Sequence, residues 1–561
     1  MLNLSASNAQ AYASRVLRKA GLVVLFTALP VVSGAADWRW PTGNSCPDVY
    51  KTGVFPVPFN AAFTSIGKMT LQNGNQVDGL VVSSFFNAIK TADGVTRTGY
   101  FERDLVARIE GIGYRNEAWW NKDRDVEIIS DLDVANPAFP SDVGQTVWPN
   151  EVAVVPDGIL PFGAVVVPEG FHITTPPNGR MTIINIDDPN KTTYIVDVES
   201  ELAPGETECL GGVPRFYHEA KWFDMDGDAL KDLVTVRSGF KATPGLCWPQ
   251  GELVWFKNPG ASIDPNVEWD EFIVSAADNG PEITLGLYDF EGDGVPEVIA
   301  NNFFAMGFLN GERIQIFGAP IGDNWTDVDL TTNPVRVATI SSGQGSPFGL
   351  RLVDLNRDGQ MDVLATNHQG DNCKISGSIP GKIYALEQPT SGDIFNDPWT
   401  THILMDNIRP NITVPTQSSG PGRLAPGLAQ AIWPTPFEEA TQKPWIVSGG
   451  DEASKVWLLK PNSESTTDWS YQSAVIFDIN DYYGPNTSQT FTAPAPATGI
   501  SISTIGSVSW RYDRAWSWGS YAEIYIPVFE GRDIHRISFR PQASTKKVVC
   551  PADVVTGVCS L

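Results

Sequence analysis

Three acidic segments recur along this chain at a constant interval, and they constrain its fold more than any other feature. They begin at Asp224, Asp289 and Asp354, so each starts 65 residues after the one before it. A fixed period of this length is typical of repeat architectures, in which each repeat forms one small structural unit.

Apolar runs flank each acidic segment in the same order. Around the first segment, a run over 220–223 leads in and a run over 233–236 leads out. Further runs follow over 253–256, which stops before Pro259, and over 271–274. Four short strands separated by turn residues form one antiparallel sheet, which is the blade of a β-propeller.

The same order of runs recurs outside the three acidic repeats, without the acidic residues. It is found within 164–196, 444–458 and 523–537, and residues 79–82 open a first copy. These copies predict an all-β fold, a seven-bladed β-propeller of four-stranded antiparallel blades. We expect a closed ring, because closure removes exposed sheet edges. Six or eight blades are the alternatives, since the first and last copies are the least regular.

We expect this propeller over residues 60–545. A signal peptide over 1–36 precedes it, because a basic region, a short apolar run over 21–32 and small residues follow one another there. An N-terminal extension over 37–59 and a C-terminal tail over 546–561 complete the predicted organisation. The apolar run is shorter than the ~20 residues of a membrane-spanning helix. We therefore expect a secreted monomer with no transmembrane segment after cleavage.

The even number of cysteines indicates disulfides formed in an oxidising compartment. Proximity in sequence favours Cys209–Cys247 and Cys550–Cys559, the second of which would lie within the tail. A bridge between Cys46 and Cys550 would instead join the two ends of the ring. Four N-x-S/T sequons follow the predicted signal peptide and predict glycans if the host is eukaryotic. They are Asn190, Asn324, Asn411 and Asn486.

The composition and the absence of known motifs exclude several function classes. The formal net charge is −26, which argues against a nucleic-acid partner because binding phosphates requires a basic face. The sequence has no C-x-x-C spacing or His-Cys cluster for zinc. It also lacks the nucleophile-elbow, phosphate-loop and dinucleotide motifs.

Each acidic segment places side-chain oxygens at its positions 1, 3, 5 and 9, which suits a hard cation such as Ca²⁺. A helix–loop–helix calcium site is excluded, because position 12 is Thr235, Ala300 or Ala365 rather than Glu. The sequence therefore predicts about three structural Ca²⁺ ions. Their predicted ligands are Asp224, Asp226, Asp228, Asp232, Asp289, Glu291, Asp293, Glu297, Asp354, Asn356, Asp358 and Asp362.

The D-x-[DEN]-x-D segment between two strands resembles the FG-GAP, or VCBS, repeat of integrin-α-type propellers. That resemblance implies the calcium-binding role of the acidic positions, and it leaves protein adhesion open as a function. The run over 253–260 also resembles, more weakly, a strand of fungal propellers, including the aldos-2-ulose dehydratase kind and certain sugar-binding lectins.

In this topology the face opposite the acidic loops collects the segments before first strands and after second strands. Rigid scaffolds often carry binding residues on such connections. The aromatic and polar residues there favour binding of a glycan or glycoprotein, with rings on sugar faces and polar groups on hydroxyls. The candidate ligand-binding residues are Phe171, His172, His218, Phe240, Asn302, Phe303, His368 and Arg532.

Three of the five histidines fall in these segments, which raises an enzymatic alternative. An imidazole base, an acid and a cationic clamp would serve a polysaccharide lyase or a sugar dehydratase, a carbon–oxygen lyase acting on carbohydrate. The candidate catalytic residues are His218, Tyr217, Glu219, His172, His368 and Arg532. A non-enzymatic, glycan-binding propeller is the leading hypothesis, because fold does not decide function.

Overall fold

The computed structural model divides into two compact units, Met1–Ser45 and Cys46–Leu561, and all the residues it describes belong to the second. The described residues are 49–70, 76–84, 89–90, 96–97, 104–110, 120–130, 146, 148–171, 179–198, 215–243, 246–278, 280–303, 312–370, 379–390, 392–411, 424–483, 488–489, 500–501, 504–513 and 520–540. No helix among them is long and apolar enough to cross a membrane. The six cysteine side chains lie outside the described part, so their pairing remains a prediction.

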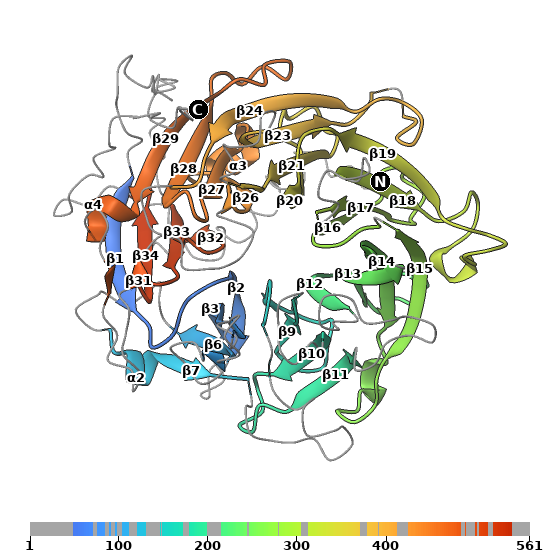
Figure 1. Cartoon of the computed structure of the whole chain (residues 1–561), viewed down its shortest axis with the longest axis horizontal. Coiled ribbons are helices and arrows are strands. Elements are labelled where there is room, and N and C mark those ends of the chain that lie inside the picture. Colours follow the sequence, from blue (N-terminus) through green and yellow to red (C-terminus); the bar gives the residue numbers. More distant parts are fainter. Residues whose placement is uncertain are drawn as a thin grey trace, which may run out of the picture. The chain divides into compact units, whose positions relative to one another are not determined.

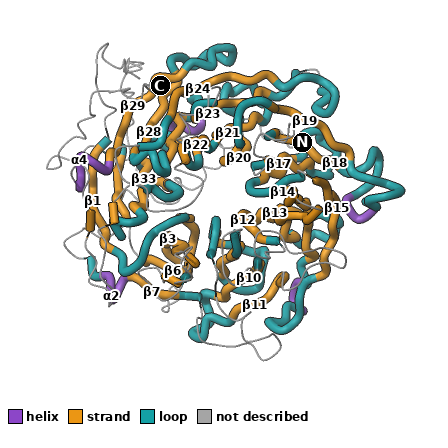
Figure 2. Tube along the Cα trace, in the orientation of Figure 1, coloured by secondary structure: helices purple, strands orange, loops and turns teal. Residues whose placement is uncertain are grey.

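Seven four-stranded antiparallel sheets follow one another around a ring, as Figure 1 shows. Figure 2 shows that, in the described part of this unit, helices are only short segments between strands. The chain is thus an all-β, seven-bladed β-propeller, as the sequence predicted, and the six- and eight-bladed alternatives are wrong.

Six blades use four strands in chain order, and the seventh takes its outer strand from the start of the chain. Blade one contains β2 (Thr64–Thr70), β3 (Gln76–Ser84), β6 (Leu105–Glu110) and β7 (Val126–Ile128), and blade two β8 (Ala153–Val154), β9 (Ala164–Pro168), β10 (Arg180–Asn185) and β11 (Thr193–Val198). Blade three contains β12 (Phe216–Phe223), β13 (Asp232–Thr243), β14 (Leu246–Lys257) and β15 (Asp270–Asp278), and blade four β16 (Leu285–Tyr288), β17 (Glu297–Asn302), β18 (Arg313–Gly318) and β19 (Arg336–Ser342). Blade five contains β20 (Pro347–Val353), β21 (Asp362–Asn367), β23 (Gly381–Glu387) and β24 (Thr400–Ile408), and blade six β26 (Ala429–Ile432), β27 (Trp445–Gly449), β28 (Lys455–Pro461) and β29 (Tyr471–Asp478). Blade seven contains β32 (Ser509–Tyr512), β33 (Ala522–Val528), β34 (Asp533–Ser538) and β1 (Tyr50–Pro56).

Alternate side chains of each strand pack against the two neighbouring blades, because successive residues point to opposite faces of a sheet. In β17, Val298 and Ala300 belong to the apolar cluster shared with blade three, whereas Ile299 belongs to the cluster shared with blade five. Both faces of each sheet are therefore buried. This explains why the strands read as short continuous apolar runs rather than as alternating ones.

The ring is closed by pairing between the first and last strands of the described chain. Strand β1 pairs antiparallel with β34, from Tyr50 opposite Ser538 to Pro56 opposite Asp533. Residues 50–56 lie within the predicted N-terminal extension over 37–59, and they form the outer strand of blade seven. The apolar Val54 and Phe55 drive this pairing, since both are buried.

An ion-pair network supports the same closure between blades seven and one. Arg511 on β32 reaches Asp78 on β3 at 2.8 Å. Its Nε donates to the Tyr525 hydroxyl at 3.1 Å, and Nη2 donates to Glu523. These groups are mostly buried, so their charges are neutralised within the closure rather than by water.

The two faces of the ring differ in chemistry. The three acidic segments connect first to second strands in blades three, four and five, and so lie on one face, here called the acidic face. The opposite face, where first strands begin and second strands end, is called the upper face. First strands line the centre of the ring (Figure 1).

We expect Phe55→Ala to destabilise the protein by about 3–5 kcal/mol, the usual cost of truncating a fully buried phenylalanine. Phe55 is 0% exposed and packs edge-on against Trp120, with ring centroids 5.2 Å apart. Urea unfolding measures the change. Phe437→Ala is the control, because Phe437 is 72% exposed and its loss should cost within about 0.5 kcal/mol. Equal, small effects of the two substitutions would show that β1 does not hold the ring closed.

Candidate functional site

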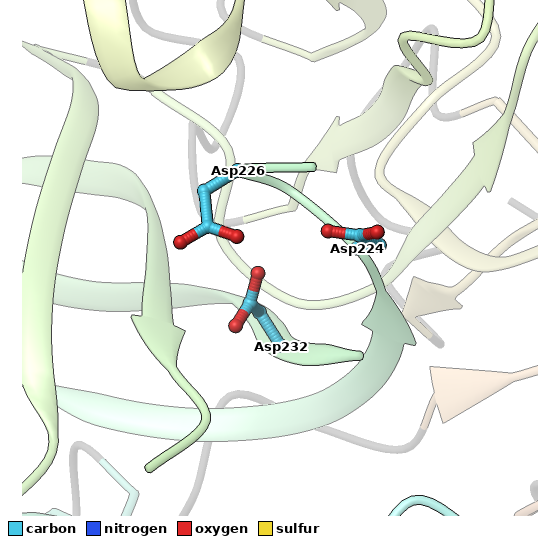
Figure 3. A group of neighbouring side chains, drawn as sticks. All are labelled: Asp224, Asp226 and Asp232. Atoms are coloured by element: carbon cyan, nitrogen blue, oxygen red, sulfur yellow. The ribbon is translucent and has the colours of Figure 1, made fainter. Parts of the chain in front are cut away.

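The acidic segment of blade three, residues 224–232, winds around its own carboxylates. Asp224 accepts hydrogen bonds from the backbone N–H groups of Gly227 at 2.8 Å and Ala229 at 2.9 Å. Both donors have positive φ, +77° and +70°, which curls the chain around the carboxylate. Ligand oxygens of Asp224, Asp226 and Asp232 lie within 4.8 Å of one another, and Figure 3 shows these side chains converging.

The segments of blades four and five, residues 289–297 and 354–362, follow the same plan. In all three, the carboxylate at position 9 accepts from the backbone N–H at position 2. Asp232 accepts from Met225 at 2.9 Å, Glu297 from Phe290 at 2.9 Å and Asp362 from Leu355 at 3.0 Å. The twelve predicted ligand residues thus lie in three loops of the same backbone plan on one face. Among the described residues, three carboxylates converge within 4.8 Å only in the loop of blade three.

Burial makes the position-9 carboxylates costly to ionise. It raises the pKa of Asp232 to about 6 and those of Glu297 and Asp362 to about 7, and neighbouring acids of the same loop add to the effect. A bound cation would offset this cost. The donors are carboxylate and amide oxygens, which fit a hard divalent ion rather than a soft one.

A second group of charged side chains meets at the centre of the ring. Arg351 on β20 contacts Glu151, just before β8, at 2.8 Å and Glu219 on β12 at 3.0 Å. Lys221 on β12 also contacts Glu219, at 2.5 Å. These four residues, named the central ion-pair network, link blades two, three and five across the centre of the ring.

Two buried polar atoms, one in the central ion-pair network and one on the neighbouring His218, lack hydrogen-bond partners. Glu151 Oε1 and His218 Nδ1 are buried, unpartnered and 3.7 Å apart. Burial and the nearby Glu219 charge raise the pKa of Glu151 to about 7. Burial lowers the pKa of His218 to about 4, so its imidazole is neutral at pH 7.

Aromatic rings lie on the upper side of this network. His218 contacts Phe63 and Phe348, with ring centroids 5.4 and 5.9 Å apart. His368 packs on Phe348 at 4.4 Å and on Phe303 at 5.9 Å. These five residues, named the aromatic layer, come from blades one, three, four and five. The three phenylalanines are partly exposed, while His218 and His368 are 3% and 7% exposed.

Several predicted residues are placed differently from the expectation. Tyr217, His218 and Glu219 lie within β12 rather than before it, because the apolar pattern of this strand begins earlier than the run over 220–223. The strand register shifts between Tyr217 and Ala220, so the regular alternation of side chains is interrupted at His218 and Glu219. Tyr217 is buried between blades two and three and donates to Asp197, away from His218.

The remaining upper-face candidates are spread over several blades. Phe171 stacks on Trp148 with ring centroids 5.4 Å apart. Asn302 is 0% exposed, and Arg532 donates through Nε to Asn60 at 3.3 Å beside the ring closure. His172 and the side chain of Phe240 lie outside the described residues.

Sequence reasoning missed Glu151, Arg351, Lys221, Phe63 and Phe348. A signal for two of them was present, since Lys221 and Arg351 are cations within otherwise apolar first strands. Strand register gives them the same place in their repeats, because Lys221 pairs with Val234 and Arg351 with Leu364. A charge repeated inside a buried strand indicates a partner across the fold.

No protein-family model and no curated protein matches the chain. Solved structures with similar folds include the GH93 α-L-arabinofuranosidase of Fusarium graminearum with arabinobiose, at 11% identity over 87% of this chain and 96% of that one, with a TM-score of 0.35. The Dos1 propeller is 8% identical over 88% and 96%, with a TM-score of 0.38. Drosophila Semaphorin 1a, extracellular domains 1–2, is 13% identical over 88% and 89%, with a TM-score of 0.36. Similarity at this level carries no information about the ligand.

We expect Glu151→Gln and His218→Gln to change the pH dependence of stability in opposite directions. A raised folded-state pKa, as for Glu151, adds stability at acidic pH that is lost as pH rises towards 7. A lowered one, as for His218, removes stability as pH falls below 6.5. When the pH is lowered from 8 to 5, the free energy of unfolding of Glu151→Gln should therefore fall by about 2–3 kcal/mol relative to that of the wild type. That of His218→Gln should rise by about 2 kcal/mol relative to the wild type.

Urea unfolding at pH 5 and pH 8, with the calcium concentration fixed, measures both changes. Asp264→Asn is the control outside the central ion-pair network, since Asp264 is exposed in the turn between β14 and β15 and its carboxylate accepts hydrogen bonds from Asn266. If the free energy of unfolding changed with pH in the same way for the wild type and both variants, the prediction would be wrong. Neither Glu151 nor His218 would then bind protons differently in the folded and unfolded states over this range.

Proposed function

We propose that the protein is a secreted, calcium-stabilised propeller of the FG-GAP/VCBS type that binds carbohydrate, free or on a glycoprotein, through its upper face. The observation that carries this proposal is the aromatic layer. Partly exposed rings from three separate blades gather there, above a centre occupied by ion pairs.

A sugar ring presents an apolar C–H face and a rim of hydroxyls, so it needs aromatic planes with polar groups beside them. Phe303 and Phe348 supply such planes, 5.5 Å apart. His368 and Asp451 lie beside them, with Nε2 and Oδ2 2.9 Å apart but not aligned as a hydrogen bond. A sugar hydroxyl could therefore donate to the Asp451 carboxylate, and could donate to or accept from the His368 imidazole according to its tautomer.

Calcium has a structural role in this proposal. Each acidic loop joins the first and second strands of one blade, and its position-9 carboxylate is costly to bury without a cation. A cation bound only by the folded state stabilises it by mass action. The acidic loops lie on the face opposite the aromatic layer, so an ion bound there would not contact the sugar.

Secretion is supported by two sequons that are compatible with glycans. Asn190 and Asn324 are both exposed, each in a turn between the third and fourth strands of its blade. Asn411 is less exposed and donates to Ser454 at 3.4 Å. If the chain passes through a eukaryotic secretory pathway, the first two are the better acceptors.

A lyase acting on a uronate or a ketosugar is the second candidate, and one observation favours it. Glu151 has a pKa of about 7 and an unpartnered oxygen facing His218, which is the protonation range of a general base at neutral pH. Elimination forms a carbon–carbon double bond that absorbs in the ultraviolet. Loss of that product in Glu151→Gln, with sugar binding retained, would favour this candidate.

Removing calcium should lower the melting temperature of the protein. Stabilisation of about 2.7 kcal/mol per site is expected when the free ion is present at 100 times its dissociation constant. Differential scanning calorimetry in 1 mM CaCl₂ and in excess EDTA, each at about the same ionic strength, measures the shift. Magnesium serves as the control cation, since it prefers smaller octahedral sites. An unchanged melting temperature would contradict a structural calcium role.

Phe303→Ala should weaken sugar binding about five- to thirtyfold, because each aromatic–sugar contact of this kind contributes on the order of 1–2 kcal/mol. A glycan array identifies the ligand, and titration calorimetry with that glycan gives the affinity of each variant. Phe437→Ala, on the opposite face, is the matched control and should leave affinity unchanged. No glycan binding by correctly folded protein, or equal losses in both variants, would contradict the proposal.

A further inference from the structure

The three acidic loops occupy the same place in their blades, so residues around them can be compared position by position. Second and third strands pair Leu233 with Phe256, Val298 with Phe317 and Val363 with Leu386. The next residue on each third strand is therefore equivalent in the three blades. These residues are Lys257, Gly318 and Glu387.

In blade three, the side chain at this position brings a cation into the acidic loop. The ammonium group of Lys257 contacts the carboxylate of Asp226, and it lies 3.1 Å from Asp228. These residues hold positions 3 and 5 of the loop, where Ca²⁺ ligands are expected. The pKa of Lys257 is raised by its hydrogen bonds to these two acids, so the group remains charged.

In blade four, a cation reaches the loop from the neighbouring strand instead. Arg336, paired with Gly318, makes two hydrogen bonds to Glu291 at 2.9 and 2.6 Å and lies 3.6 Å from Glu297. A side chain at position 318 would prevent this arrangement, because a Cβ there would lie 2.8 Å from the Arg336 guanidinium. Phe395 covers the other side, with its ring centroid 4.2 Å from the guanidinium carbon.

In blade five, both equivalent positions lack a cation. Glu387 replaces the lysine and pairs with His402 at 2.7 Å, and Thr400 stands opposite it in the place of Arg336. Among the described residues, no ion pair joins a basic side chain to the acids of this loop. Arg357, within the loop, points away and donates to backbone carbonyls of residues 439, 440 and 442.

Blade five also retains an oxygen with no partner. Oδ1 of Asp354, at position 1, is buried and accepts no hydrogen bond, although Oδ2 accepts from Gly359 at 3.0 Å. A buried carboxylate oxygen without a donor is costly and indicates a missing partner. In the other two loops the position-1 carboxylates, Asp224 and Asp289, accept through both of their oxygens.

We infer that the three loops are not equivalent calcium sites. The loop of blade five is the principal Ca²⁺ site, whereas Lys257 and Arg336 act as tethered cations that compete with Ca²⁺ in blades three and four. This inference rests on the proposed calcium role and specifies which residues set its strength. A positive charge about 4–5 Å from a divalent ion weakens its binding, even at the dielectric constant of water.

Calcium titration calorimetry on the chelator-treated protein tests this inference with binding itself as the readout. We expect one strong site in the wild type, lost in Asp354→Asn. Lys257→Met and Arg336→Met should each strengthen one further site at least about tenfold, because each removes the competing charge while keeping a long side chain. Lys68→Met removes the same net charge from an exposed position of β2, in blade one, which has no acidic loop, and should change nothing.

The possible failures are distinguishable. Three sites of equal strength that do not respond to Lys257→Met or Arg336→Met would overturn the inference and leave the calcium proposal intact. No binding by the wild type or by any variant would overturn the calcium proposal and this inference with it. Binding that appears only in the two methionine variants would overturn the assignment to blade five. Circular dichroism of each calcium-free variant confirms that it is folded before titration.

Discussion

Pairing between β1 and β34 is the interaction on which the rest of this structure depends. A ring of blades buries both faces of every sheet only if its two ends meet. At that junction, the backbone of β1 completes blade seven. The side chain of Phe55 packs with Tyr525 and Ile534 in an apolar cluster that also contains Leu80 of blade one. The ion pair between Arg511 and Asp78 spans the same junction.

Once the ring is closed, each blade still has to fix the polar turn between its first and second strands. Blades three to five do so with acidic loops. In blade six, the buried Lys443 donates to backbone carbonyls of Ser465 and Asp468 in the turn between its third and fourth strands. In blade seven, Asp513 accepts from Arg540 at 2.6 Å. In these two blades, side chains therefore make the cross-link that a bound ion would support in the others. The contact is between a lysine and backbone carbonyls in blade six and is an ion pair in blade seven.

The repeat itself could be predicted from the sequence because its signal is periodic and local. The 65-residue interval and the flanking apolar runs depend on burial of whole strands, which short-range pattern reveals. The acidic loops were predictable for the same reason, since their ligand positions are close in sequence. The outer strand of blade seven was not, because Tyr50–Pro56 pairs with residues almost 500 positions away, and no local signal specifies such a partner.

The upper-face site was predicted only in part, and again the distance between partners in sequence explains why. His218, Phe303 and His368 were candidates because they lie where second strands end or first strands begin. His218 meets Phe63 and Phe348, which both come from other blades, and Glu151 meets Arg351 from 200 residues away. Even the exact start of β12 mattered, since it turned Tyr217 away from His218 into the seam with blade two.

Strands β12 and β20 connect the two faces and limit how calcium could influence a ligand. Near its start each strand carries a residue of the aromatic layer, His218 or Phe348, and it ends one residue before an acidic loop, which begins at Asp224 or Asp354. Six residues of extended strand separate these points, a distance of about 20 Å. The central ion-pair network lies between them and joins both strands through Glu219 and Arg351. At that distance a bound ion would act on the upper face by holding β12 and β20 in place, and its direct field at the aromatic layer would be screened.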